Sequence, residues 1–97
     1  MNSLVAMERD NQECLFCRHI LGIHSESSVP HHIFTRRVRY DLEAQITLCM
    51  TRSQADKKGN NLGCHPRLET AYQLDGETEI TRERLLALME SVYGYQY

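Results

Sequence analysis

The spacing of hydrophobic and polar positions along the chain predicts short strands in the first half and helices in the second half. Residues 29–40 carry β-branched and aromatic side chains and predict a short strand or hairpin, and residues 46–49 predict a second short strand. Helical spacing follows near the C-terminus, where Leu85, Leu88 and Met89 share one face. Such a mixture of short strands and helices is typical of a small α+β protein.

Capping residues predict where the two later helices begin and end. Thr81 predicts the start of the C-terminal helix, and Gly94 predicts its end. Another helix is expected to begin near His65 or Pro66, because proline is tolerated in the first helical turn, and to run to about residue 73.

The chain has 97 residues, too few for two independent cores, so residues 1–97 are expected to form one domain. Residues 14–73 hold the motifs described below, and the C-terminal helix covers about 81–93. Residues 1–13 predict a frayed start or a short helix, and the polar stretch 51–63 predicts an exposed loop.

A core this small benefits from a metal or another additional stabilising element, and the chain has four cysteines and five histidines. The longest apolar run covers residues 85–89, which is too short for a transmembrane helix. The N-terminal residues lack the shape of a signal peptide, so we expect a protein of a reducing cytoplasm. Cysteines in that compartment are metal ligands more often than disulfides.

The cysteines form the pattern C-x2-C-x31-C-x14-C. Cys14 and Cys17 have the spacing at which two thiolates reach one tetrahedral metal from a tight turn. Cys49 and Cys64 complete a set of four, and we expect this set to hold a structural Zn²⁺ whose binding stabilises the fold. The alternatives are buried free cysteines, which behave as small apolar residues, and disulfides.

A formal net charge of −2 conceals a basic segment in the middle of the chain. Residues 31–67 hold seven lysine and arginine residues against three acids, and both flanks are acidic. A positive patch between acidic flanks fits a nucleic-acid partner, although an ordinary solvated loop would have the same charge. The expected DNA-contacting residues are Arg36, Arg37, Lys57, Lys58 and Arg67.

Histidines lie beside the cysteines in this basic segment. His31 and His32 are adjacent in the first predicted strand, and His65 follows Cys64 at the predicted start of a helix. The order Cys-x2-Cys, His-His-Ile, Ile-Thr-Leu-Cys and Cys-His over residues 14–65 resembles the HNH nucleases, particularly the small phage and bacterial type with a four-cysteine zinc site. The resemblance implies a zinc-stabilised ββα-metal domain, here with an additional C-terminal helix.

In that family, a ββα-metal unit holds one catalytic divalent cation against the scissile phosphate. The resemblance implies that His31 and His65 bind this cation (Mg²⁺, Mn²⁺ or Zn²⁺) and that His32 is the general base that deprotonates water. The implied activity is hydrolysis of phosphodiester bonds in double-stranded DNA, in the cytoplasm of a bacterium or of a phage-infected host. Glu69, one turn after His65, is either a third ligand or a solvated acid.

The sequence departs from the family's pattern at two places. Ala44 stands where the family has an Asn that hydrogen-bonds to the backbone, and the neighbouring Gln45 is a candidate for the same role one position out of register. Residues 51–63 lengthen the connection between the last two cysteines. One alternative is therefore a zinc-containing DNA-binding module without cleavage, and another is a zinc-ribbon module whose acidic C-terminal helix binds a protein. A homodimer is also compatible, because nucleases that cut both strands often need two active sites.

Overall fold

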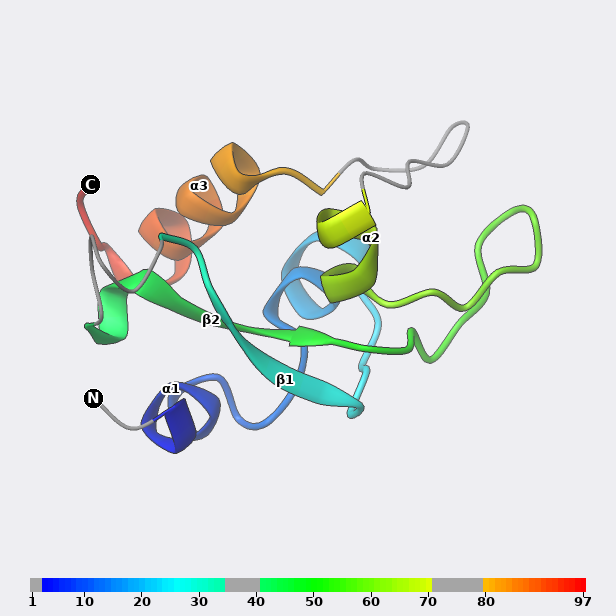
Figure 1. The fold of residues 1–97 in the computed structure, drawn as a ribbon, viewed down its shortest axis with the longest axis horizontal. Helices are drawn as coiled ribbons and strands as arrows, with labels where there is room; N and C mark the ends of the chain where they lie inside the picture. The colour runs from blue at the N-terminus through cyan, green and yellow to red at the C-terminus, as the bar shows by residue number, and fades with distance from the viewer. Residues whose placement is uncertain (1–2, 35–40, 71–79) are drawn as a thin grey trace.

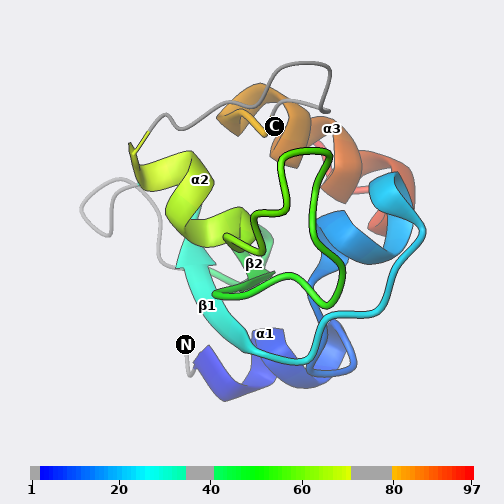
Figure 2. The same cartoon turned by 90° about the vertical axis from the view of Figure 1, so that its right-hand side faces the viewer.

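The computed structural model describes residues 3–34, 41–70 and 80–97 of the chain. The sheet of the two strands lies between α1 on one side and α2 and α3 on the other (Figures 1 and 2). The elements in chain order are helix α1 (Ser3–Arg9), the π-helical turn η1 (Cys17–Leu21), strand β1 (Ser28–His32), the 3₁₀ turn η2 (Leu42–Ala44), strand β2 (Gln45–Cys49), helix α2 (Cys64–Thr70) and helix α3 (Arg82–Tyr93). The predicted α+β class is therefore confirmed.

The strands β1 and β2 pair in antiparallel orientation, with His31 opposite Ile46. Strand β2 is buried along its whole length, so its polar residues Gln45 and Thr47 are fully buried together with Ile46 and Leu48. Strand β1 is only partly buried, and it tolerates Pro30 because, among the described residues, it pairs with β2 alone. Of the strand or hairpin predicted over residues 29–40, the first part forms β1. Residues 35–40 lie outside the described residues.

Helix α3 has the predicted ends. The Thr81 Oγ1 accepts a hydrogen bond from the backbone N–H of Arg84 at 3.2 Å, which caps the N-terminus. Gly94 adopts a φ of 73°, a left-handed conformation that favours glycine, and its N–H donates to the carbonyl of Glu90 at 2.8 Å.

The other predicted segments form with small differences. Helix α2 begins at Cys64, slightly before the expected start, and its predicted end falls in residues 71–79, outside the described residues. The predicted loop 51–63 is closed at its base by a bridge between Thr51 and Leu62. Within the described ranges, none of the helices has the length and apolarity needed to cross a bilayer.

The core lies between the sheet, η1 and α3. Ile46 and Leu48 of β2 pack with Leu85 and Met89 of α3, and all four are fully buried. The remaining members of the same buried cluster are Cys14, Leu15, Phe16, Cys17, Ile33, Cys49, Cys64, Ile80 and Leu88. The four cysteines are therefore part of the hydrophobic core itself.

An ion pair between the partly buried Arg9 and the buried Asp10 attaches α1 to the sheet. The guanidinium of Arg9 donates to both carboxylate oxygens of Asp10 at 2.7 and 2.8 Å. Two further N–H groups donate to the carbonyls of Leu42 at 2.7 Å and Gln45 at 2.6 Å. A bidentate arginine of this kind fixes geometry as well as charge.

The Asp10 carboxylate extends this network to β2 and α3. It accepts the backbone N–H of Thr47 at 2.9 Å, which satisfies a donor on an edge of the sheet, and the hydroxyl of Tyr93 at 2.5 Å. Burial and the hydrogen bond to Asp10 raise the pKa of Tyr93, so its hydroxyl remains a donor. One carboxylate thus connects α1, β2 and α3.

We expect Asp10→Ala to lower the free energy of unfolding by about 3–5 kcal/mol, because the largely buried guanidinium of Arg9 would lose its counter-charge. Chemical denaturation followed by circular dichroism measures this change. Glu8→Ala, which removes an exposed acid from the same helix, is the matched control. Equal stabilities of the two variants would contradict a central role for Asp10.

Candidate metal centres

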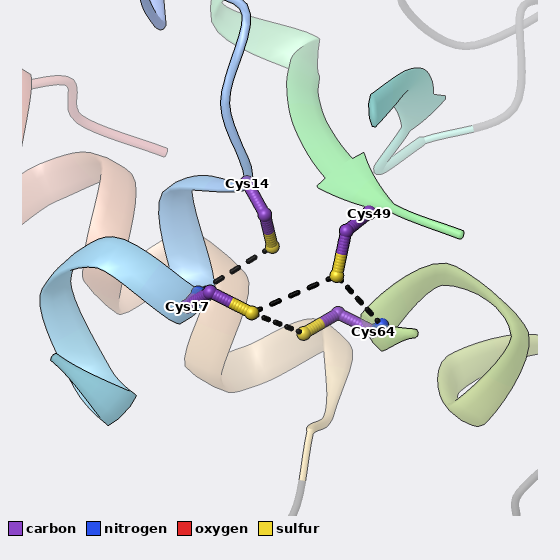
Figure 3. A group of neighbouring side chains, drawn as sticks. All are labelled: Cys14, Cys17, Cys49 and Cys64. Atoms are coloured by element: carbon purple, nitrogen blue, oxygen red, sulfur yellow. Dashed lines mark hydrogen bonds between the residues drawn. The ribbon is translucent and has the colours of Figure 1, made fainter. Parts of the chain in front are cut away.

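Four cysteine side chains from separate parts of the chain meet in the core (Figure 3). Cys14 precedes η1, Cys17 begins it, Cys49 ends β2 and Cys64 begins α2. The Sγ of Cys17 lies 3.6 Å from the Sγ atoms of both Cys49 and Cys64, and all four sulfurs lie within 4.8 Å of one another. A disulfide has its sulfurs about 2.05 Å apart, so all four cysteines are unpaired thiols.

This spacing fits the ligands of one tetrahedral metal ion. Sulfurs held at about 2.3 Å from a central zinc at the corners of a tetrahedron lie about 3.8 Å from one another. All four cysteines are fully buried, so the ligand atoms are shielded from solvent. The structure thus brings together the four predicted ligands, and the cluster can hold a structural metal ion.

Backbone N–H groups point at two of the sulfurs. The N–H of Cys17 donates to the Sγ of Cys14, and the N–H of Cys64 donates to the Sγ of Cys49, each at 3.4 Å. The pKa of Cys49 is lowered because the thiols of Cys14, Cys17 and Cys64, together with this N–H, donate to its sulfur. The thiolate is the form that binds metal, and these donors favour it at Cys49.

Gly63 allows two segments to approach closely beside the cysteines. A Cβ at this position would lie 2.2 Å from the carbonyl carbon of Met50 and 2.3 Å from the carbonyl oxygen of Cys49. The N–H of Gly63 donates to the Met50 carbonyl at 3.0 Å, which places Cys64 next to Cys49. The sequence offers one signal for this requirement, a glycine directly before a cysteine at the end of a polar loop.

Arg52 reaches the sulfurs from the loop 51–63. The residue is 3% exposed, and its Nη2 donates to the Sγ of Cys64 at 3.4 Å. Burial disfavours the charged guanidinium, but its interactions with Cys64, Cys17 and Cys49 outweigh burial and raise the pKa of Arg52. The polar composition of the loop predicted exposure, and the structure places this arginine inside.

Two histidines and one glutamate form a second cluster between β1 and α2. The rings of His31 and His65 lie with their centroids 5.2 Å apart and their planes at 76°. The Oε1 of Glu69 lies 3.6 Å from the Nε2 of His65 and 3.9 Å from the Nδ1 of His31. Because Glu69 follows His65 by four residues on α2, both side chains lie on the same helical face. The three donors are close enough to share one ion.

His31 is held in its neutral form. Burial, with a further contribution from the neighbouring His65, lowers the pKa of His31 to about 4, and the opposing effect of Glu69 is smaller. A neutral imidazole has a lone pair available for a metal ion. At neutral pH, therefore, no proton has to leave His31 for a cation to bind.

His32 follows His31 on β1 and lies opposite Gln45 of β2. Successive side chains of a strand point to opposite faces, so His32 and His31 do not direct their rings at the same place. The fully buried Gln45 donates from Nε2 to the carbonyl of Asp41 at 3.4 Å, a side-chain contact to the backbone between the strands. Ala44, also fully buried, has no side-chain group for such a bond.

Arg67 holds the loop 51–63 against α2. Its guanidinium donates to the carboxylate of Asp56 at 3.1 Å and to the carbonyl of Leu62 at 2.6 Å, and the residue is 3% exposed. The other oxygen of Asp56 accepts the backbone N–H groups of Lys58 and Asn60 at 2.8 and 3.0 Å. This burial corrects the expectation that Arg67 contacts DNA, because its donors already serve the protein.

The remaining predicted DNA-contacting residues fall into two groups. Lys57 and Lys58 are exposed on the loop 51–63, as their polar surroundings predicted. Arg36 and Arg37 lie outside the described residues.

Comparison of the chain with protein-family models, with curated proteins and with solved structures finds no match in any of the three. Its function is therefore inferred from the two clusters of side chains that can bind a metal ion.

We expect Gly63→Ala to separate Cys64 from Cys49 and to expose the cysteine cluster, because a Cβ cannot fit against the backbone of residues 49 and 50. The measurement is the rate at which the thiols of the purified protein react with a disulfide reagent, together with the melting temperature. Gly59→Ala is the control, because it introduces backbone strain at a φ of 77° with open space around the new Cβ. Thiol reactivity as slow in Gly63→Ala as in Gly59→Ala would contradict the requirement for glycine.

We expect the ring protons of His31 to show no titration between about pH 5 and 8 in the absence of added divalent cation, because its imidazole is already neutral there. In His65→Ala, the pKa of His31 should move upward toward its ordinary value, since one of the causes of its depression is removed. Nuclear magnetic resonance of the histidine ring protons measures both. A His31 titration that is unchanged in His65→Ala would contradict the assigned cause.

Proposed function

We propose that this protein is an HNH-type endonuclease, a small zinc-stabilised ββα-metal domain that hydrolyses phosphodiester bonds in double-stranded DNA with the help of a divalent cation. The observation that carries the proposal is the convergence of His31 and His65, with Glu69, where α2 meets β1. The strands β1 and β2 and the helix α2 also follow one another in the chain order of a ββα unit.

The four cysteines hold the structural ion in this proposal. Four thiolates at tetrahedral spacing are a ligand set typical of Zn²⁺. The fully buried cluster leaves no open position for substrate, which fits a structural role and not a catalytic one.

The second cluster holds the catalytic cation. Two imidazole nitrogens and a carboxylate oxygen suit a divalent ion, and the 56% exposure of the Glu69 side chain keeps the site accessible to a phosphodiester. A cation bound there would offset the charge that develops at the scissile phosphate. His31 contributes its lone pair without first losing a proton, because its pKa is about 4.

His32 is the proposed general base. Its ring accepts the proton of the attacking water, a task suited to a side chain whose unperturbed pKa lies close to neutral pH. The alternation of β1 separates this role from metal binding at His31. The amide of Gln45 supports the backbone between the strands through Asp41, in place of the Asn that the family has at the position of Ala44.

The expected contacts to DNA come from exposed basic residues. Lys57 and Lys58 project from the loop 51–63 and can meet phosphates, which supplies affinity without sequence specificity. Arg36 and Arg37, close in sequence to His31 and His32, are the remaining candidates.

A DNA-binding module without cleavage is the second candidate function. Ala44 favours it, because alanine cannot make the hydrogen bond that the family's Asn makes. The buried Oε1 of Gln45 has no hydrogen-bond partner among the described residues, so this amide replaces the expected interaction only in part.

We expect the purified protein to nick or cut supercoiled plasmid in the presence of Mg²⁺ or Mn²⁺, and His32→Ala to reduce the rate by about 10²- to 10⁴-fold, as expected for loss of a general base. His19→Ala, which removes an exposed histidine outside the proposed site, is the matched control. DNA binding by His32→Ala should remain at the wild-type level, measured by fluorescence anisotropy at two salt concentrations.

Equal cleavage by the wild type and His32→Ala would remove His32 from the mechanism. Salt-sensitive binding without cleavage would instead favour the DNA-binding module. Neither cleavage nor DNA binding would leave the zinc-ribbon interaction module as the better hypothesis.

A further inference from the structure

Arg52 is a buried cation whose charged group meets sulfur. The residue is 3% exposed, and its Nη2 lies 3.4 Å from the Sγ of Cys64. Its Nε is buried and has no hydrogen-bond partner among the described residues. The nearby carboxylate of Asp56 already pairs with Arg67 at 3.1 Å.

A buried guanidinium is costly unless an opposite charge compensates it. Within the described part of the chain, no carboxylate lies at ion-pair distance from Arg52. The sulfurs of the cysteine cluster are therefore its counter-charge.

The cysteine cluster needs a positive charge, as Arg52 needs a negative one. Four thiolates around one divalent cation carry twice the negative charge that the ion neutralises, and here the excess lies in a fully buried place. A cation in hydrogen-bond contact with one sulfur lowers the cost of this excess.

The backbone of Arg52 is fixed where this contact requires it. Its N–H donates to the carbonyl of Asn61 at 2.8 Å, and its own carbonyl accepts the Nδ2 of Asn61 at 3.1 Å. The two sides of the loop 51–63 thus hold each other, and the guanidinium enters the core from a defined position.

We propose that Arg52 is the internal counter-charge of the four-cysteine centre and a determinant of its affinity for zinc. This inference rests on the proposed occupation of that centre by Zn²⁺. The lengthened connection between the last two cysteines then has a function of its own, because it supplies the cation that the buried thiolates need.

The test compares zinc affinity, measured by competition with a chromophoric chelator, in the wild type, Arg52→Met and Arg52→Lys. Arg52→Met keeps much of the side-chain volume without the charge and should weaken zinc binding by about 10- to 100-fold. Arg52→Lys keeps the charge and should recover part of this loss. Arg84→Met, which removes an exposed arginine from α3, is the control and should bind zinc as the wild type does.

Cobalt substitution separates an effect of charge from a rearranged site. The absorption bands of the Co²⁺-loaded variants should retain the pattern of four thiolates while the affinity falls. Equal zinc affinities of Arg52→Met and the wild type would overturn the inference, and so would equal losses in Arg52→Met and Arg52→Lys.

Two further results also test the inference. If Arg52→Met does not fold at saturating zinc, the rate of zinc release from Arg52→Lys is measured instead. Release close to the wild-type rate supports the role of charge. Release about 10-fold faster or more overturns it. A wild-type protein that binds no zinc would contradict the proposed structural centre, a failure distinct from that of Arg52.

Discussion

The convergence of four sulfurs in the core is the constraint on which the rest of the structure depends. The cysteines come from the start of η1, the end of β2 and the start of α2, so their meeting fixes these elements relative to one another (Figure 3). Such a centre can supply stability that a chain of this length does not obtain from apolar burial alone. It also determines where α2 begins, and α2 carries His65 and Glu69. The position of the second cluster therefore depends on the first.

Three buried or partly buried arginines connect the outer parts of the chain to this core, each through a different group. Arg9 pairs with Asp10 and joins α1 to the sheet, and Arg67 pairs with Asp56 and holds the loop 51–63 to α2. Arg52 meets the cysteine sulfurs. The guanidinium suits all three places because its planar donors satisfy carboxylates, carbonyls and sulfur in a fixed geometry. Basic residues that composition alone assigns to a nucleic-acid surface thus divide into internal and exposed groups.

The two ligand clusters differ in burial and in donor type. The four cysteines are fully buried and have sulfur donors only, whereas the histidine and glutamate cluster includes a side chain that is 56% exposed. A closed site keeps its ion, and an open site leaves coordination positions for water and substrate. In the proposed function, the closed cluster holds the ion that stabilises the fold and the open cluster holds the ion that acts at the phosphodiester.

The sequence by itself determined the features that depend on local spacing. These were the two strands, the helix between Thr81 and Gly94 and the ligand spacing of Cys14 and Cys17, because helix caps, side-chain periodicity and ligand spacing act over a few residues. Only the tertiary structure decided which charged residues are internal. Arg52 lies in the same polar stretch 51–63 as the exposed Lys57, and Arg67 lies on the helix that follows; the burial of the two arginines follows from contacts with Cys64 and Asp56. The need for glycine at position 63 likewise arises where its backbone meets that of Cys49 and Met50, since steric exclusion between such segments exists only after they are brought together.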